Sequence, residues 1–198
     1  MLEITEFLIT VGYIGIFLAI FAESGFFAGF FLPGDSLLFT AGLLASQGYF
    51  NIWWLAIGCF LAAVLGDTFG YTFGYHVGPK IFTREDSFFF HKKHLERTAR
   101  FYERYGRKTI LIARVVPIVR TFAPIFAGVG KMPYKVFLSY NITGGFVWSW
   151  GFLFAAFYLG RAIPGIGQYL EYIVIGIIVL SFAPIVFEYA RSKCHQNN

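Results

Sequence analysis

The feature that most constrains the fold is an apolar stretch, residues 7–46, that is too long to cross a membrane once. As a single helix it would be about 60 Å long, twice the hydrocarbon thickness of a bilayer. Its only charged residues are Glu23 and Asp35, and Pro33-Gly34 interrupts it. Proline breaks a helix and glycine permits a tight turn. We therefore expect residues 7–48 to form a helical hairpin that enters and leaves the membrane on the same side.

The composition places the whole chain, residues 1–198, in one integral membrane domain. Hydrophobic residues make up 57% of it and charged residues 14%, whereas a soluble domain carries about 25% charged residues. Residues 80–108 contain nine Lys/Arg, and residues 1–79 contain none. This asymmetry is a signal of membrane topology rather than of nucleic-acid binding, and it predicts that residues 80–108 are cytoplasmic.

The rest of the chain repeats the first arrangement, a broken apolar stretch followed by an uninterrupted one. The predicted segments are a span at 50–78, a cytoplasmic amphipathic basic linker helix at 80–108, a second hairpin broken at Pro117 at 109–133, a span at 136–160 and a last span at 169–190. A cytoplasmic linker places the N-terminus outside, the two hairpins on opposite sides and the C-terminus in the cytoplasm. The predicted fold is an all-α inverted repeat of two re-entrant hairpins, an architecture found in many secondary transporters.

Small residues recur at every fourth position of the span at 50–78. They are Gly58, Ala62, Gly66, Gly70, Gly74 and Gly78. A ridge of this kind lets another helix approach closely, so we expect it to serve helix packing. The same ridge would also suit contacts between the subunits of a homo-oligomer.

Four charged residues lie inside or at the bends of the apolar stretches: Glu23, Asp35, Arg114 and Arg120. One ionisable group at the bilayer centre costs on the order of 3 kcal/mol, so four unpaired groups would cost about 12 kcal/mol, comparable to the stability of a domain. We therefore expect the two carboxylates and the two guanidiniums to face one another or to share a wet cavity. Asp67, beside the small-residue ridge, is either a third carboxylate of that cavity or a polar contact between helices.

The two arginines favour a phosphate ligand. Arg114 and Arg120 flank Pro117, and arginine offers phosphate a planar, bidentate partner. Free backbone N–H groups at broken helix ends also attract anions. Because a phosphate would compete with Glu23 and Asp35 for the arginines, the hypothesis includes protonation of the acids, with Glu23 as the better proton carrier. The alternative is that the ion pairs only hold the two hairpins together.

Two blocks of sequence resemble the DedA family of bacterial inner-membrane proteins, which is related to the eukaryotic VTT (SNARE-associated) domain proteins. The first runs from Glu23 through FLPGDSLLF at 31–39, and the second from ARVVPIVRTFAP at 113–124 through Ala127-Gly128-Val129-Gly130. Gly66-Asp67 and Tyr140-Asn141 also fit the family pattern, which makes Asp67 and Asn141 secondary site candidates.

The resemblance implies two opposed re-entrant hairpins, lipid translocation, and an acid pair and an arginine pair that fall on Glu23, Asp35, Arg114 and Arg120. Family members are linked to the return of undecaprenyl phosphate across the inner membrane, to envelope homeostasis and to the proton motive force. The eukaryotic relatives are linked to phospholipid scrambling. The expected function is therefore proton-linked translocation of undecaprenyl phosphate or a similar polyprenyl-phosphate carrier.

Two alternatives stand beside this function: a general phospholipid scramblase, and a structural or assembly protein for envelope homeostasis. An enzyme is not expected, because nucleophilic catalysis needs a nucleophile beside a general base and no histidine lies near either block. The intramembrane carboxylates are too few to hold a metal ion. We expect no cofactor and no nucleic-acid partner.

Overall fold

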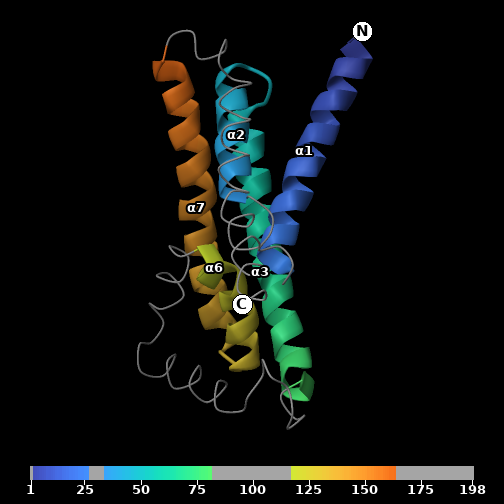
Figure 1. Ribbon diagram of the computed structural model, residues 1–198, viewed down its shortest axis with the longest axis vertical. Coiled ribbons are helices and arrows are strands. Elements are labelled where there is room, and N and C mark those ends of the chain that lie inside the picture. The colour runs from blue at the N-terminus through green and yellow to red at the C-terminus, as the bar shows by residue number, and fades with distance from the viewer. Residues whose placement is uncertain (1, 27–33, 82–116, 164–198) are drawn as a thin grey trace, which may run out of the picture.

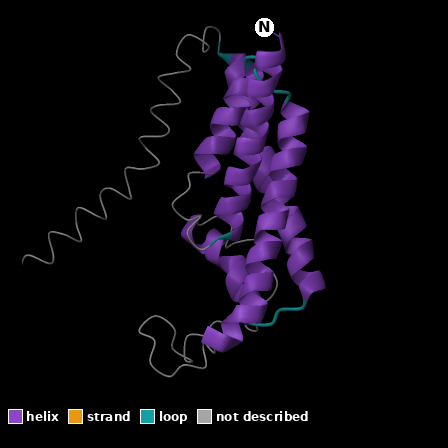
Figure 2. Ribbon diagram, turned by 90° about the vertical axis from the view of Figure 1, so that its right-hand side faces the viewer, coloured by secondary structure: helices purple, strands orange, loops and turns teal. Residues whose placement is uncertain are grey.

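The computed structural model describes residues 2–26, 34–81 and 117–163, and all the regular structure in these ranges is α-helix. The helices are α1 (Leu2–Gly25), α2 (Gly34–Ser46), α3 (Ile52–Ile81), α6 (Pro117–Val129) and α7 (Tyr134–Ala162). They form an elongated bundle (Figure 1 and Figure 2). The predicted last span at 169–190 lies outside the described residues, as does the predicted basic linker at 80–108 apart from its first two residues, which end α3.

Within the described residues, two helices are long and apolar enough to cross a membrane: α3, over Ile52–Val77, and the whole of α7. Both coincide with predicted spans, at 50–78 and 136–160. Large apolar side chains at helical spacing form one exposed stripe along α3, made by Trp54, Ile57, Leu61, Leu65, Phe69 and Phe73. Because water would be an unfavourable neighbour for a continuous apolar surface of this kind, the stripe suits a helix that faces lipid.

The helix boundaries follow from local chemistry. Between α2 and α3, Gly48 has a φ of 86°, a left-handed conformation that glycine adopts without steric cost. Asn51 then caps α3, because its Oδ1 accepts hydrogen bonds from the backbone N–H groups of Trp53 at 2.9 Å and Trp54 at 3.4 Å. Helix α6 begins at Pro117, whose fixed φ suits a first helical position and whose missing N–H costs nothing there.

Helices α2 and α6 both begin about halfway along the bundle and run in opposite directions (Figure 1). Helix α1 runs from one end of the bundle to this level, and α2 returns to the same end, whereas α3 and α7 run the full length. Helices α1 and α6 pack mainly on α3, and α2 packs mainly on α7. The two helices of the predicted first hairpin therefore rest on different partners and make few contacts with each other.

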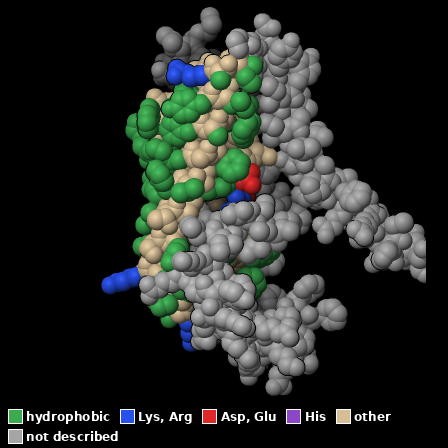
Figure 3. Space-filling view, turned by 90° about the vertical axis from the view of Figure 1, so that its left-hand side faces the viewer, with side chains coloured by type: hydrophobic (Ala, Val, Ile, Leu, Met, Phe, Trp, Pro, Cys, Tyr) green, Lys and Arg blue, Asp and Glu red, His purple; other side chains and the backbone are tan. Residues whose placement is uncertain are grey.

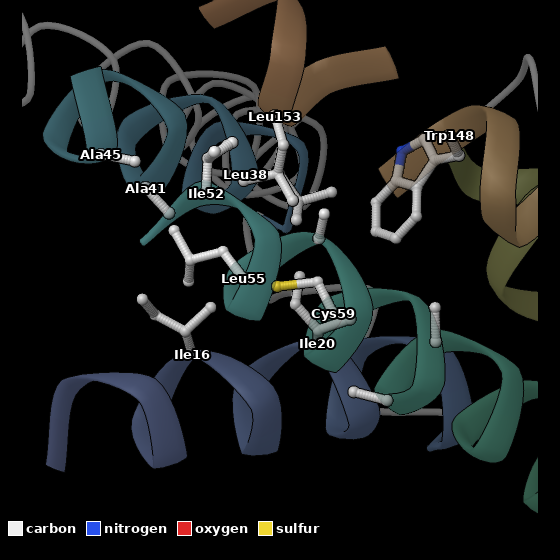
Figure 4. Close-up of a cluster of buried hydrophobic side chains, with 13 residues drawn as sticks. Ile16, Ile20, Leu38, Ala41, Ala45, Ile52, Leu55, Cys59, Trp148 and Leu153 are labelled. Carbon is white, nitrogen blue, oxygen red and sulfur yellow. The ribbon is translucent and has the colours of Figure 1, made fainter. Parts of the chain in front are cut away.

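The main hydrophobic core joins four helices at the end of the bundle that holds the N-terminus. Ile16 and Ile20 come from α1, Leu38 from α2, Leu55 from α3 and Leu153 from α7, and all are buried (Figure 4). Because this one cluster includes both long helices, it fixes the positions of α1 and α2 relative to α7.

The small-residue ridge of α3 is the surface on which α1 and α6 pack. A Cβ at Gly66 would lie 2.6 Å from the carbonyl oxygen of Phe21 in α1, and a Cβ at Gly74 would overlap the carbonyl oxygen of Ile125 in α6. Such backbone-to-backbone contact is possible only where side chains are absent. The predicted role of the ridge in helix packing is therefore confirmed for these two positions, within a single chain.

We expect Gly74→Ala to lower the free energy of unfolding by about 1–3 kcal/mol, the usual cost of overpacking, because its methyl group needs the space of the Ile125 carbonyl. Denaturant titration of the purified protein in detergent micelles measures the change. Gly151→Ala is the matched control, since a Cβ there meets nothing within 4 Å and alanine has the higher helix propensity. Equal stability of the two variants would contradict the close contact.

Candidate functional site

Arg120 lies in the first turns of α6 and is held between two carboxylates from other helices. Its Nη2 donates a hydrogen bond to Oε1 of Glu23 in α1 at 2.5 Å, and its Nη1 donates one to Oδ1 of Asp35 in α2 at 2.7 Å. Both contacts are also ion pairs. The structure therefore brings three of the four predicted site residues together, and the fourth, Arg114, lies outside the described residues.

The helices that carry Glu23 and Arg120 converge on the glycine ridge of α3. The last turn of α1 and the middle of α6 both approach α3 at Gly70, where a Cβ would lie 3.5 Å from the Gly25 carbonyl oxygen and 3.6 Å from Cβ of Pro124. A Cβ at Gly70 would make ordinary van der Waals contact, whereas one at Gly66 would collide with α1 and one at Gly74 with α6. The glycine ridge and the charged residues, which the sequence shows as separate patterns, thus lie together at one site.

Glu23 is enclosed. Only 5% of its surface is exposed, and its second oxygen, Oε2, has no hydrogen-bond partner among the described residues. The first residue of α2, Gly34, lies directly against this oxygen, because a Cβ at Gly34 would overlap the carboxylate. The glycine of the Pro33-Gly34 break therefore makes room for the acid that pairs with Arg120.

Asp35 is more open than Glu23. Its side chain is 35% exposed, against 6% for the side chain of Glu23. It lies in the first turn of α2, where the positive end of the helix dipole favours a carboxylate. Figure 3 shows an acidic group at the surface about halfway along the molecule, with a basic group beside it.

Trp148 of α7 completes the arrangement and is absent from the predicted site residues. Its Nε1 donates a hydrogen bond to Oδ1 of Asp35 at 2.6 Å, and the guanidinium carbon of Arg120 lies 4.3 Å from the centroid of its ring. A signal for it exists in the sequence. Trp148 lies at the midpoint of the span, whereas tryptophan in membrane proteins concentrates at the two interfaces.

The two secondary candidates are both buried but have different surroundings. Asp67 of α3 is 4% exposed and lies within electrostatic reach of Arg120. Asn141 of α7 is 1% exposed and donates hydrogen bonds from Nδ2 to the Val64 carbonyl at 3.0 Å and to Thr68 Oγ1 at 3.4 Å. Asp67 therefore belongs to the electrostatic surroundings of the site, and Asn141 joins α7 to α3.

Among the described residues, the site is an anion-attracting guanidinium that is already occupied by anions. Glu23, Asp35 and Arg120 carry a formal sum of −1 when both acids are ionised, and Glu23 and Arg120 are buried. Charge-assisted hydrogen bonds are strong in such surroundings, and arginine binds carboxylate and phosphate by the same planar geometry. The arrangement can therefore exchange one oxyanion for another.

Comparison with known proteins identifies the family of the chain. Residues 32–157 match the family model described as the VTT domain. The chain is 43% identical to Protein DedA of Escherichia coli (strain K12) over 183 residues, which is 91% of this chain and 83% of that protein. It is 42% identical over 165 residues to an uncharacterized membrane protein of Mycobacterium leprae (strain TN), which is 83% of this chain and 73% of that protein. No solved structure gives a significant match.

The extent of these matches is sufficient for assignment. The family model spans both the start of α2 with Asp35 and the start of α6 with Arg120, and the bacterial relatives align over most of their own length. The resemblance seen in the two sequence blocks is therefore confirmed. The chain belongs to the DedA family of membrane proteins and contains the VTT domain.

Proposed function

We propose that this protein moves a phosphate-bearing lipid across the bacterial inner membrane, and that the lipid is undecaprenyl phosphate or a similar polyprenyl phosphate. The observation that carries the proposal is the buried guanidinium of Arg120, held by two carboxylates and a tryptophan ring halfway along a membrane bundle. A buried cation at this depth is costly, and such residues usually mark a functional site. A lipid phosphate is an anion that the membrane itself supplies.

The charge of the site supports coupling to protons. A phosphate monoester adds about 1.5 to 2 negative charges to a cluster that already sums to −1 in its described part. Two carboxylates and a phosphate cannot all stay ionised around one guanidinium without strong repulsion between the anions. We therefore propose that Glu23 and Asp35 are the proton-coupling residues, and that Arg120, together with Arg114, binds the phosphate.

The membrane arrangement that goes with this function is an inverted repeat. We propose that α1 and α2 form a re-entrant hairpin from the outer side and that α6 ends a second hairpin from the cytoplasmic side. The nine Lys/Arg of residues 80–108 begin at the far end of α3 and favour a cytoplasmic position for that end, with the N-terminus outside. Half-length helices that start at the midplane direct their positive ends toward a bound anion, as in many transporters.

We propose a transporter rather than an enzyme because the described site holds one exchangeable oxyanion position and no paired nucleophile and base. Its partners are the lipid and protons, and it needs no metal or cofactor for this task. A homo-oligomer is compatible with the proposal. The glycine contacts described above are, however, already used within one chain.

Translocation by Arg120→Lys tests the proposal. In proteoliposomes, the wild type should move labelled polyprenyl phosphate faster than an ordinary phospholipid, and Arg120→Lys should reduce the rate about tenfold to a hundredfold. Lysine cannot make the two forked hydrogen bonds, and each charge-assisted bond contributes about 1.5–3 kcal/mol. Arg161→Lys is the matched control, because Arg161 stacks on Phe157 at 4.8 Å in the last turn of α7, remote from Glu23 and Asp35.

The outcomes separate the candidate functions. Equal movement of both lipids would identify a scramblase, and no movement by the wild type would leave only an assembly role. Repeating the assay with and without an imposed proton gradient tests the coupling on its own. A rate that ignores the gradient would remove the proton from the mechanism and leave lipid translocation intact.

A further inference from the structure

Two hydrogen-bond donors converge on a single oxygen at the centre of the site. Oδ1 of Asp35 accepts from Arg120 Nη1 at 2.7 Å and from Trp148 Nε1 at 2.6 Å. The same indole ring lies under the guanidinium, 4.3 Å from ring centroid to guanidinium carbon. One carboxylate oxygen from α2 therefore occupies an oxyanion position that is formed by donors from α6 and α7.

The indole N–H needs such an oxygen. It is a donor with no acceptor capacity, and a buried donor without a partner is costly. Trp148 is 8% exposed and lies at the midpoint of a span, so bulk water at the interface does not serve it. Any ligand that takes Asp35 away from Trp148 must offer an oxygen in its place.

The two acids differ in how easily they can leave Arg120. Glu23 is enclosed, and its carboxylate lies against the backbone of Gly34, so its departure requires the start of α2 to move. Asp35 has a side chain that is 35% exposed and lies at the surface, so it can leave without rearranging a helix. The exchangeable anion is Asp35 and the fixed one is Glu23.

From this geometry we infer that Oδ1 of Asp35 holds the place of a substrate phosphate oxygen, and that Trp148 is a phosphate-binding residue. The inference rests on the proposed function. The arriving phosphate displaces Asp35 from Arg120, receives the N–H of Trp148 and the Nη1–H of Arg120, and leaves Glu23 on Nη2. Asp35 thus keeps both donors satisfied while the site is empty and competes with the lipid for them.

Binding of farnesyl phosphate, a short polyprenyl monophosphate, to the purified protein in detergent tests this inference. We expect Trp148→Phe to weaken binding about tenfold, because phenylalanine keeps a ring under the guanidinium and loses the N–H. Asp35→Asn should strengthen binding about tenfold, because the competing anion is gone. Trp150→Phe is the matched control, since the buried Nε1 of Trp150 has no hydrogen-bond partner among the described residues.

Two further ligands test whether the site recognises a lipid phosphate or free phosphate. Farnesol has the same chain without the phosphate, and its binding should be equal in wild type and Trp148→Phe. Inorganic phosphate has the same oxygens without the chain, and it should bind much more weakly than farnesyl phosphate if the site takes a lipid headgroup. Inorganic phosphate that binds as well as farnesyl phosphate would overturn the lipid assignment.

A second measurement does not depend on the folding of any variant. In wild-type protein labelled with ¹⁵N-tryptophan, the indole N–H resonance of Trp148 should shift on addition of farnesyl phosphate, and that of Trp150 should not. An unchanged Trp148 resonance at saturation would overturn the inference, as would wild-type affinity in Trp148→Phe while Arg120→Lys abolishes binding. The proposed function would survive both results. The proposed function would fail if the wild type did not move the polyprenyl phosphate, or moved an ordinary phospholipid equally well.

Discussion

Replacing Arg120 with leucine is expected to lower the free energy of unfolding by about 3–5 kcal/mol, the cost of breaking a buried ion pair by removing one partner. The loss leaves Glu23, which is 5% exposed, with a buried and uncompensated charge. Trp148 can still donate to Asp35, but nothing in the described part of the chain replaces the bond to Glu23. Denaturant titration in detergent micelles measures the effect.

A triple variant identifies the cause of this loss. Adding Glu23→Gln and Asp35→Asn to Arg120→Leu removes the unpaired charges, and replacement of a whole buried ion cluster by neutral groups is often close to neutral for stability. Most of the lost stability should therefore return. Arg161→Leu, an exposed position, should change stability by less than about 0.5 kcal/mol. A triple variant as unstable as Arg120→Leu alone would mean that packing of the arginine, rather than its charge, is what matters.

Gly34→Ala is expected to inactivate the protein. The new methyl group would overlap the carboxylate of Glu23, so either that side chain leaves Arg120 or the start of α2 shifts and carries Asp35 with it. Both movements disrupt the anion position. We expect translocation in proteoliposomes to fall at least about tenfold, with a loss of about 1–3 kcal/mol in the free energy of unfolding from overpacking.

A second substitution, at Glu23, tests whether the Gly34→Ala methyl group acts by colliding with the Glu23 carboxylate. Glu23→Asp shortens the acid by one methylene and vacates the overlapped space, so the double variant with Gly34→Ala should recover stability without recovering translocation. Gly15→Ala is the matched control, because a Cβ at Gly15 of α1 meets nothing within 4 Å. If Gly34→Ala moved lipid at the wild-type rate, the close fit of α2 over Glu23 would be contradicted.

The sequence was sufficient to predict those parts of the fold that depend on local composition. The span at 136–160 has no charge, and α7 runs over Tyr134–Ala162; the breaks at Pro33-Gly34 and Pro117 are where α2 and α6 begin. The charges at Glu23, Asp35 and Arg120 had to be paired because of their depth, and they are. These predictions succeeded because each depends on the cost of placing one kind of residue in lipid.

Other features depend on which helix packs against which, and spacing along one helix does not contain that information. The two helices of the first hairpin pack on different partners, α1 on α3 and α2 on α7. The α2 contact is made at Gly42, where a Cβ would lie 2.5 Å from the Leu153 carbonyl oxygen, and it is not among the features predicted from the sequence. Trp148 was missed because its role depends on Asp35 and Arg120, which lie far from it in sequence.

The glycine contacts on α3 also bear on motion. Helices that meet through backbone atoms have few interlocking side chains, so one can slide along the other with few changes of rotamer, whereas packed side chains resist such shear. Helix α1, which carries Glu23, and helix α6, which carries Arg120, both rest on α3 in this way. Their one described ion pair, at 2.5 Å, would break if either helix slid by a few ångströms. The pairing of Glu23 with Arg120 therefore reports the axial position of α1 relative to α6.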